Sequence, residues 1–429
     1  MWWPKTRRQE ELVALAGELG ARFAARAAGH DRDGTFPHEN FADLHASGYL
    51  ALSIPREFGG GGASYLELAL AQERLARGDA STALGAGRHL SILGRLGWAV
   101  LTGAKGEAGG EAGGWTPERY ATVARAVVEE GALLNSAASE PEMGSPSRGG
   151  RPATTASPDG TPLGQAAHFV ITGRKTYTTM APGLRFFLVS ATLDGPEGPE
   201  AAQFLLERGL PGLSVEETWD AVGMRASGSH DLVLEAVRAP ADSLLSRRPY
   251  RPAGGPGEGQ AAQPAPSEGA GWGALIPAVY LGLATAAREE AVRFAARRKP
   301  GPLGGQAIGE LPAVQRLLGE IEVALAESRA LLFGTTEAWL EAPQRRAELQ
   351  PLLGAAKYVV TNRAVEVTDR AMRILGGAGL SRSQPVQRHY RDARAGLHHP
   401  PMDDVALAAL ARGALATVAE ETSAVPGGA

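Results

Sequence analysis

The sequence contains no cysteine. That absence excludes disulfides, thiolate metal sites and a cysteine nucleophile, and we predict no metal site. It is also typical of the reducing cytoplasm, which is the location we expect. A large excess of either charge is also absent, because the formal net charge is −4 and acidic and basic residues are mixed along the chain. Without a basic arm or stripe, a nucleic-acid partner is not expected.

Long apolar runs are missing as well. The N-terminal segment MWWPKTRRQEEL carries charges where a signal peptide would need an apolar core. The longest apolar run of the C-terminal half, residues 272–287, is shorter than the roughly 20 apolar residues that a membrane span needs. It continues into a polar helical pattern, so we expect a buried core helix and no membrane span. Glycine-rich dinucleotide and phosphate-loop fingerprints are also absent, which disfavours the simple nucleotide-binding folds.

What the chain does have is three regions of different periodicity. Residues 8–130 carry apolar positions at helical spacing, whereas residues 134–242 contain short β-branched or aromatic runs with a period of two. A second helical region has segments near 271–298, 311–342, 349–377 and 385–420. The sequence therefore predicts an α+β fold with an N-terminal helical domain (1–133), a middle β-barrel or β-sandwich (134–248), a Pro/Gly-rich linker (249–270) and a C-terminal four-helix bundle (271–429).

Six short segments stand in the same order as in the acyl-CoA dehydrogenase superfamily. They are SEPEMGS at 139–145, TGRKTYTT at 172–179, VGMRAS at 222–227, VRAP at 237–240, ILGGAG at 374–379 and RHYRDAR at 388–394. Each is weak alone, but together they extend over nearly the whole chain, which resembles a divergent member of this superfamily. The resemblance implies a flavin, FAD rather than FMN, and a homotetramer or at least a dimer.

By this resemblance, the middle domain supplies one half of the flavin site. Ser139 and Ser145 would provide donors to the pyrimidine edge and the phosphates of the flavin. Tyr177 would stack on the ring in place of the usual Trp, and the Thr179 hydroxyl would approach N5. The alternative is that Tyr177 and Thr179 are simply positions of an alternating strand. The Gly-x-Lys that precedes them also matches and favours the cofactor role.

The helical bundle would supply the other half of the site, across a subunit interface. Arg298 matches an arginine that contacts the pyrophosphate of a neighbouring subunit's cofactor, although KPGPL at 299–303 replaces the usual aromatic–glycine turn. Arg298 is interpretable equally as a solvated charge at a helix C-terminus. Gly376 and Gly377 would let the backbone approach the dinucleotide closely, or would serve as an ordinary helix cap.

The carboxylate that the resemblance makes catalytic is missing. Dehydrogenation needs a carboxylate that removes the α-proton of an acyl-CoA thioester. Most members place a Glu where this chain has Pro400, and the stretch that carries the Glu in a minority of members has none here either. In one interpretation, Asp403, Asp404 or His399 replaces the missing Glu as the catalytic base. Asp403 and Asp404 are otherwise N-cap residues of the helix that starts at Val405.

A second interpretation removes the need for that base. The reduced-flavin monooxygenases of the superfamily have His-Asp-Pro where this chain has His398-His399-Pro400, and use a histidine of the N-terminal domain whose counterpart is His89. The YRDAR and GGAG segments favour the dehydrogenase. We therefore expect α,β-dehydrogenation of an acyl-CoA in fatty acid metabolism, with an electron-transfer flavoprotein as acceptor. Monooxygenation is the alternative, and non-catalytic acyl-CoA binding is a third.

Overall fold

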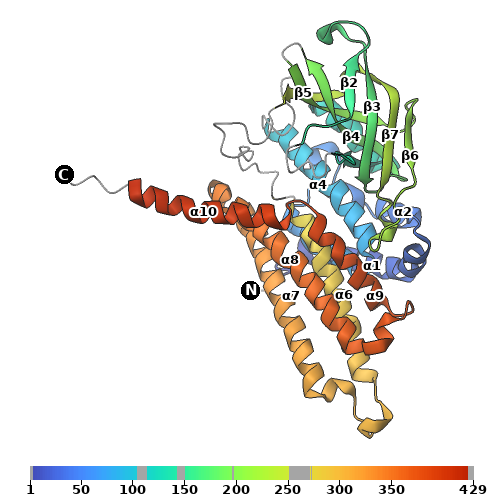
Figure 1. The fold of residues 1–429 in the computed structure, drawn as a ribbon, viewed down its shortest axis with the longest axis vertical. Helices are drawn as coiled ribbons and strands as arrows, with labels where there is room; N and C mark the ends of the chain where they lie inside the picture. The colour runs from blue at the N-terminus through green and yellow to red at the C-terminus, as the bar shows by residue number, and fades with distance from the viewer. Residues whose placement is uncertain are drawn as a thin grey trace, which may run out of the picture.

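The computed structural model consists of helices, then a sheet, then helices again (Figure 1). It describes residues 3–103, 114–142, 150–195, 198–250, 271 and 273–423 of the chain, with side chains as far as residue 415. The first part holds α1 (Arg7–Asp33), α2 (His38–Ala46), α3 (Tyr65–Ala76), α4 (Ala80–Thr102) and α5 (Pro117–Glu130). This order of elements confirms the α+β fold class that the sequence predicts.

The middle part is one eight-stranded sheet rather than two layers. Its strands are β1 (Leu133–Ala137), β2 (Thr155–Pro158), β3 (His168–Thr178), β4 (Leu184–Gly195), β5 (Gly198–Glu207), β6 (Leu213–Glu216), β7 (His230–Pro240) and β8 (Leu244–Pro249). The order β6-β7-β3-β2-β4-β5-β8 puts β6 and β8 at the ends of the sheet, and β1 joins β4 in parallel. Strand β3 therefore lies inside the sheet, between β7 and β2, with its C-terminal end facing the N-terminal helices.

The last part contains α6 (Leu275–Arg297), α7 (Pro312–Glu341), α8 (Arg346–Leu375), α9 (Pro385–Ala393) and α10 (Asp403–Ser423). Helix α6 is the central one, because it packs against α3 and α4 as well as α7, α8 and α9. Gly282 allows the close crossing with α3, since a Cβ atom there would lie 2.1 Å from the backbone oxygen of Glu73. The apolar run of the sequence is thus a buried core helix from Leu275 onward. Among the described residues, no helix is both long and apolar enough to cross a membrane.

The helix predicted over 385–420 is divided into two. Helix α9 ends at Ala393, a 3-10 turn (Arg394–His398) follows, and α10 begins only at Asp403. The cause is Pro400-Pro401, because proline has no N–H and restricts the residue before it to extended conformations. Helix α10 then leaves the body of the molecule (Figure 1). The break brings the chain around residue 399 back against α6.

Candidate functional site

The end of strand β3 is a strained turn that points one aromatic side chain outward. Tyr177 and Met180 have φ angles of 56° and 66°, in the left-handed region that non-glycine residues rarely adopt. The side chain of Tyr177 is 67% exposed and meets Trp219 edge-on, with 6.1 Å between the ring centroids. A regular strand would put Tyr177 and Thr179 on one face, but the turn buries Thr179. Strain of this kind gathers at ligand sites.

Thr179 belongs to a short chain of hydroxyl groups. Its Oγ1 lies 3.1 Å from Oγ of Ser229, which lies 2.7 Å from Oγ of Ser227. The Thr179 carbonyl accepts a hydrogen bond of 2.9 Å from the Asn135 side chain on β1. Ser227 closes the VGMRAS segment, so two of the six segments meet at this point in the structure.

Ser139 and its neighbour Glu140 bring in a third segment. The Ser139 carbonyl accepts from the backbone N–H of Thr176 at 2.9 Å. The buried Glu140 carboxylate pairs with Nζ of Lys175 at 2.5 Å and accepts from the backbone N–H of Thr154. Burial opposes its ionisation, but the hydrogen bonds from Lys175 and Thr154 outweigh burial and lower the pKa of Glu140. Ser145, the other serine predicted to bind the cofactor, lies outside the described residues.

A second polar cluster lies beside Pro400, where the sequence expects a catalytic carboxylate. Nδ1 of His399 lies 3.1 Å from the Arg88 guanidinium of α4, and Nε2 lies 2.7 Å from the Tyr280 hydroxyl of α6. Burial, together with the nearby charges of Arg88 and Lys357, lowers the pKa of His399 well below its ordinary value. Burial raises the pKa of Tyr280. A neutral imidazole thus lies between a cation and a protonated phenol.

The carboxylates near this cluster already have partners. Asp403 pairs with Nζ of Lys357 at 3.2 Å and accepts from the Asn362 amide at 2.9 Å. Asp392 is buried and accepts a 2.6 Å hydrogen bond from the backbone N–H of Met224. Burial raises the pKa of Asp392 to about 7. Helix α10 begins at Asp403 itself rather than at Val405, so Asp403 and Asp404 are residues of its first turn rather than its N-cap.

Helix α4 connects the two clusters. A Cβ atom at Gly85 would lie 2.7 Å from the Met180 side chain, so α4 passes directly against the turn that carries Thr179. Arg88 follows one helical turn later on the same side of α4. Sequence reasoning missed both Arg88 and Tyr280. Their signals were an arginine directly before His89 and a single tyrosine inside an otherwise apolar helix.

His89 itself is placed away from this cluster. Its Nδ1 accepts a hydrogen bond of 3.1 Å from the backbone N–H of Leu134 at the start of β1, and its side chain is fully buried. Burial lowers the pKa of His89 to about 4. These contacts favour a role in joining α4 to the sheet over the catalytic role that the sequence suggests.

The predicted residues of the helical bundle lie far from β3 within one chain. Arg298 caps α6 and lines a surface hollow of about 320 Å³ with Arg293, Arg297 and Gln384. Figure 1 places the α6–α7 connection at the end of the bundle away from the sheet. Gly376, with a φ of 57°, ends α8, and a Cβ atom at either Gly376 or Gly377 would meet nothing within 4 Å. A single chain therefore does not bring Arg298 to Tyr177.

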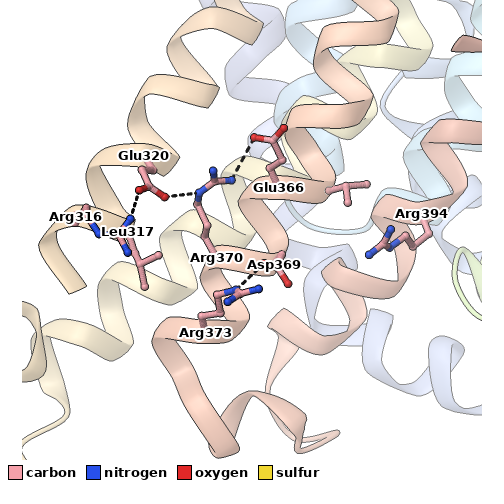
Figure 2. Close-up of a pocket in the computed structure, with 9 residues that line it drawn as sticks. Arg316, Leu317, Glu320, Glu366, Asp369, Arg370, Arg373 and Arg394 are labelled. Carbon is pink, nitrogen blue, oxygen red and sulfur yellow. Dashed lines mark hydrogen bonds and ion pairs between the residues drawn. The ribbon is translucent and has the colours of Figure 1, made fainter. Parts of the chain in front are cut away.

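Another surface hollow, of about 450 Å³, lies between α7, α8 and the turn after α9 (Figure 2). Arg370 pairs with Glu320 at 2.8 Å and with Glu366 at 3.3 Å, and Arg373 pairs with Asp369 at 2.7 Å. The charges largely cancel, as in an ordinary surface ion-pair network. Within the part of the chain that the structure describes, no group of three or more His, Asp and Glu side chains could hold a metal ion.

Comparison with known protein families gives one consistent match. Residues 6–103, 135–237 and 274–414 match the models for the N-terminal, middle and C-terminal domains of acyl-CoA dehydrogenase. A putative acyl-CoA dehydrogenase of Bacillus subtilis (strain 168), YdbM, is 43% identical over 94% of this chain and 96% of its own length.

Other relatives have names that refer to different chemistry. The amino sugar nitrososynthase RubN8 of Streptomyces rubradiris is 31% identical over 91% of this chain and 86% of its own length. The crystal structure of KijD3 in complex with FMN and dTDP-3-amino-2,3,6-trideoxy-4-keto-3-methyl-D-glucose has a TM-score of 0.80 and 29% identity. That match covers 96% of this chain and 95% of KijD3.

Proposed function

The chain belongs to the acyl-CoA dehydrogenase family, and from this premise we propose that it is a flavin-dependent monooxygenase, which uses reduced flavin and oxygen. The observation that carries the proposal is the cluster beside Pro400. Dehydrogenation needs an available carboxylate of raised pKa next to the substrate. Here His399 is held between Arg88 and Tyr280, and both oxygens of Asp403 are engaged by Lys357 and Asn362.

The residues of the β3 turn fit a flavin. The exposed ring of Tyr177 offers an aromatic face. The hydroxyl chain that begins at Thr179 offers a hydrogen-bond partner at the edge of that face. Among the described residues, the buried hydroxyls of Thr176 and Thr178 find no hydrogen-bond partner. When bound, a reduced flavin would supply the electrons that activate oxygen.

The cluster beside Pro400 supplies one proton donor. Arg88 is a donor only, so Nδ1 of His399 accepts and the neutral ring carries its proton on Nε2. Nε2–H then donates to the Tyr280 oxygen, which directs the phenolic proton away from His399. Because the pKa of Tyr280 is raised by burial, that hydroxyl stays protonated at neutral pH. Oxygen transfer needs such a donor and does not need a base that abstracts an α-proton.

The choice between FAD and FMN and the proposed oligomer both depend on the part of the site around Arg298. Arg298 and Arg297 line a hollow in which Arg293 is paired with Glu290, and the remaining positive charge would suit the pyrophosphate of FAD. Because that hollow is remote from Tyr177 in one chain, the proposal includes an oligomer, dimer or tetramer, in which neighbouring chains complete each site. The FMN in the crystal structure of KijD3 supports the smaller flavin instead. Chromatography of the flavin released from the purified protein distinguishes the two.

Dehydrogenation of an acyl-CoA is the second candidate. The name of the relative with 43% identity favours it. In that case Asp403, three residues after Pro400, would have to leave Lys357 to act as the base. An electron-transfer flavoprotein would then accept the electrons, a partner that monooxygenation does not require.

The test separates the two candidates with the same purified holoprotein. Anaerobic titration with short-, medium- and long-chain acyl-CoAs should leave the oxidised flavin yellow. Rapid mixing of the reduced holoprotein with oxygen should release hydrogen peroxide more slowly than free reduced flavin does. Tyr280→Phe should accelerate that release, whereas Tyr390→Phe, which removes a hydroxyl bonded to Arg394, should not. Bleaching of the flavin by any acyl-CoA would overturn the proposal in favour of dehydrogenation.

A further inference from the structure

Arg88 carries a positive charge that its surroundings do not neutralise. Its hydrogen-bond partner in the described part of the chain is Nδ1 of His399, which is a neutral acceptor. No ion pair of the described residues includes Arg88. A guanidinium has five N–H donors, so the described residues use only a small part of the hydrogen-bonding capacity of Arg88. Buried charges are normally paired, because an unpaired one loses its hydration without compensation.

The charged groups around Arg88 leave one positive charge in excess. Lys357 lies near the same imidazole, but Asp403 neutralises it at 3.2 Å. Asp392 is engaged by the backbone N–H of Met224 and has Arg388 as its neighbouring cation. The other groups that face Arg88 are the neutral His399 ring and the protonated Tyr280. Among the described residues, the planar guanidinium cation of Arg88 is therefore left without a counter-charge.

The position of Arg88 connects this charge to the site of chemistry. Gly85 of helix α4 contacts Met180, which follows Thr179 directly in the strained turn. Arg88 lies about one turn farther along the same helix. Arg88 is largely buried but keeps some solvent exposure. A ligand bound to its free N–H groups would lie beside the Tyr280 hydroxyl, because His399 contacts both side chains.

We propose that Arg88 binds a single carboxylate of the substrate, so that the protein acts on small monocarboxylate molecules. A carboxylate matches the guanidinium in geometry, with two parallel hydrogen bonds, and in charge, because one negative charge balances the one excess positive charge. A phosphate dianion would need a second free cation, and Lys357 is already paired. The inference rests on the proposed function for the reaction, but the binding of a carboxylate does not depend on turnover.

The experiment measures the binding of benzoate, benzamide and phenyl phosphate to the oxidised holoprotein by calorimetry. Benzoate should bind to the wild type about 10- to 100-fold more tightly than to Arg88→Met, the range expected for a charge-assisted pair of hydrogen bonds. Benzamide has nearly the same shape and no charge, so its weak binding should be the same in both proteins. Arg7→Met, which removes a 91% exposed arginine, is the matched control and should bind benzoate like the wild type.

Arg88→Lys keeps the charge and loses the fork, so its affinity for benzoate should lie between those of the wild type and Arg88→Met. If Arg88→Met does not fold, Arg88→Lys replaces it in the test. An affinity of Arg88→Lys for benzoate equal to that of the wild type would then overturn the proposal. Equal benzoate binding by wild type and Arg88→Met, or tighter binding of phenyl phosphate than of benzoate, would overturn it as well. Benzoate binding without slowed peroxide release would instead refute only the proposed monooxygenation.

Discussion

His89 provides a quantitative prediction, because its titration is governed by burial. The ordinary pKa of a histidine is about 6.5, and burial lowers that of His89 to about 4. The unfolded chain therefore binds a proton at this residue between those two values, whereas the folded chain does not. Since the unfolded state binds more protons in this range, the free energy of unfolding falls as the pH falls. The contribution of His89 is fully present above about pH 6.5 and decreases below it.

The magnitude follows from the two pKa values. Between about pH 7.5 and about pH 5, the difference in protonation removes roughly 2 kcal/mol of stability through His89 alone. His89→Asn is the informative change, because an Asn oxygen takes the place of Nδ1 and still accepts from the Leu134 N–H but does not titrate. The variant loses some packing at both pH values, so the prediction concerns the change of stability with pH.

Urea unfolding followed by tryptophan fluorescence at the two pH values measures that change. The wild type should lose about 2 kcal/mol more than His89→Asn on acidification. His38→Asn, at an exposed histidine, is the control and should behave like the wild type. Equal pH dependence in wild type and His89→Asn would refute a buried, neutral His89. If His89→Asn keeps its flavin and its stability but loses activity, the result would instead support a catalytic role for His89.

Two further predictions concern the β3 turn. Thr179→Val should lower flavin affinity about tenfold, because it removes a hydrogen bond at the proposed ring edge; flavin content after gel filtration measures it, and unchanged content would remove Thr179 from the site. Lys175→Met should cost about 3–5 kcal/mol in urea unfolding, because it leaves the buried Glu140 carboxylate unpaired. The double variant Glu140→Gln/Lys175→Met should recover most of that loss, and equal loss in both variants would contradict this explanation.

Much of the fold could be predicted from periodicity. The strands β3, β4, β5 and β7 are long and rich in β-branched or aromatic residues, and each coincides with a run of period two in the sequence. The strands β1, β2, β6 and β8 were missed, because runs of four to six residues are too short to show a clear period. The division of the predicted helix over 385–420 was missed for a different reason. The apolar pattern continues across Pro400-Pro401, although the backbone cannot.

The candidate site was less predictable, because its residues meet only in three dimensions. The segment resemblance located Tyr177 and Thr179, and the structure gives them opposite exposures that a regular strand would not. Arg88 and Tyr280 carry only weak local signals, since an isolated arginine or tyrosine in a helix is ordinary. Their importance comes from His399, which reaches α4 and α6 only because the chain breaks before α10.

The loss of the carboxylate at position 400 and the presence of Arg88 are parts of one arrangement. A Glu at Pro400 would lie next to His399 and hence near the guanidinium of Arg88, which has no ion-pair partner among the described residues. A cation at that range favours the ionised carboxylate and lowers its pKa, whereas an α-proton base needs a raised pKa. The same cation that makes this position unsuitable for a base makes it suitable for holding an anionic substrate beside the Tyr280 hydroxyl. Under the proposed function, the site would bind an anion and donate a proton instead of abstracting one.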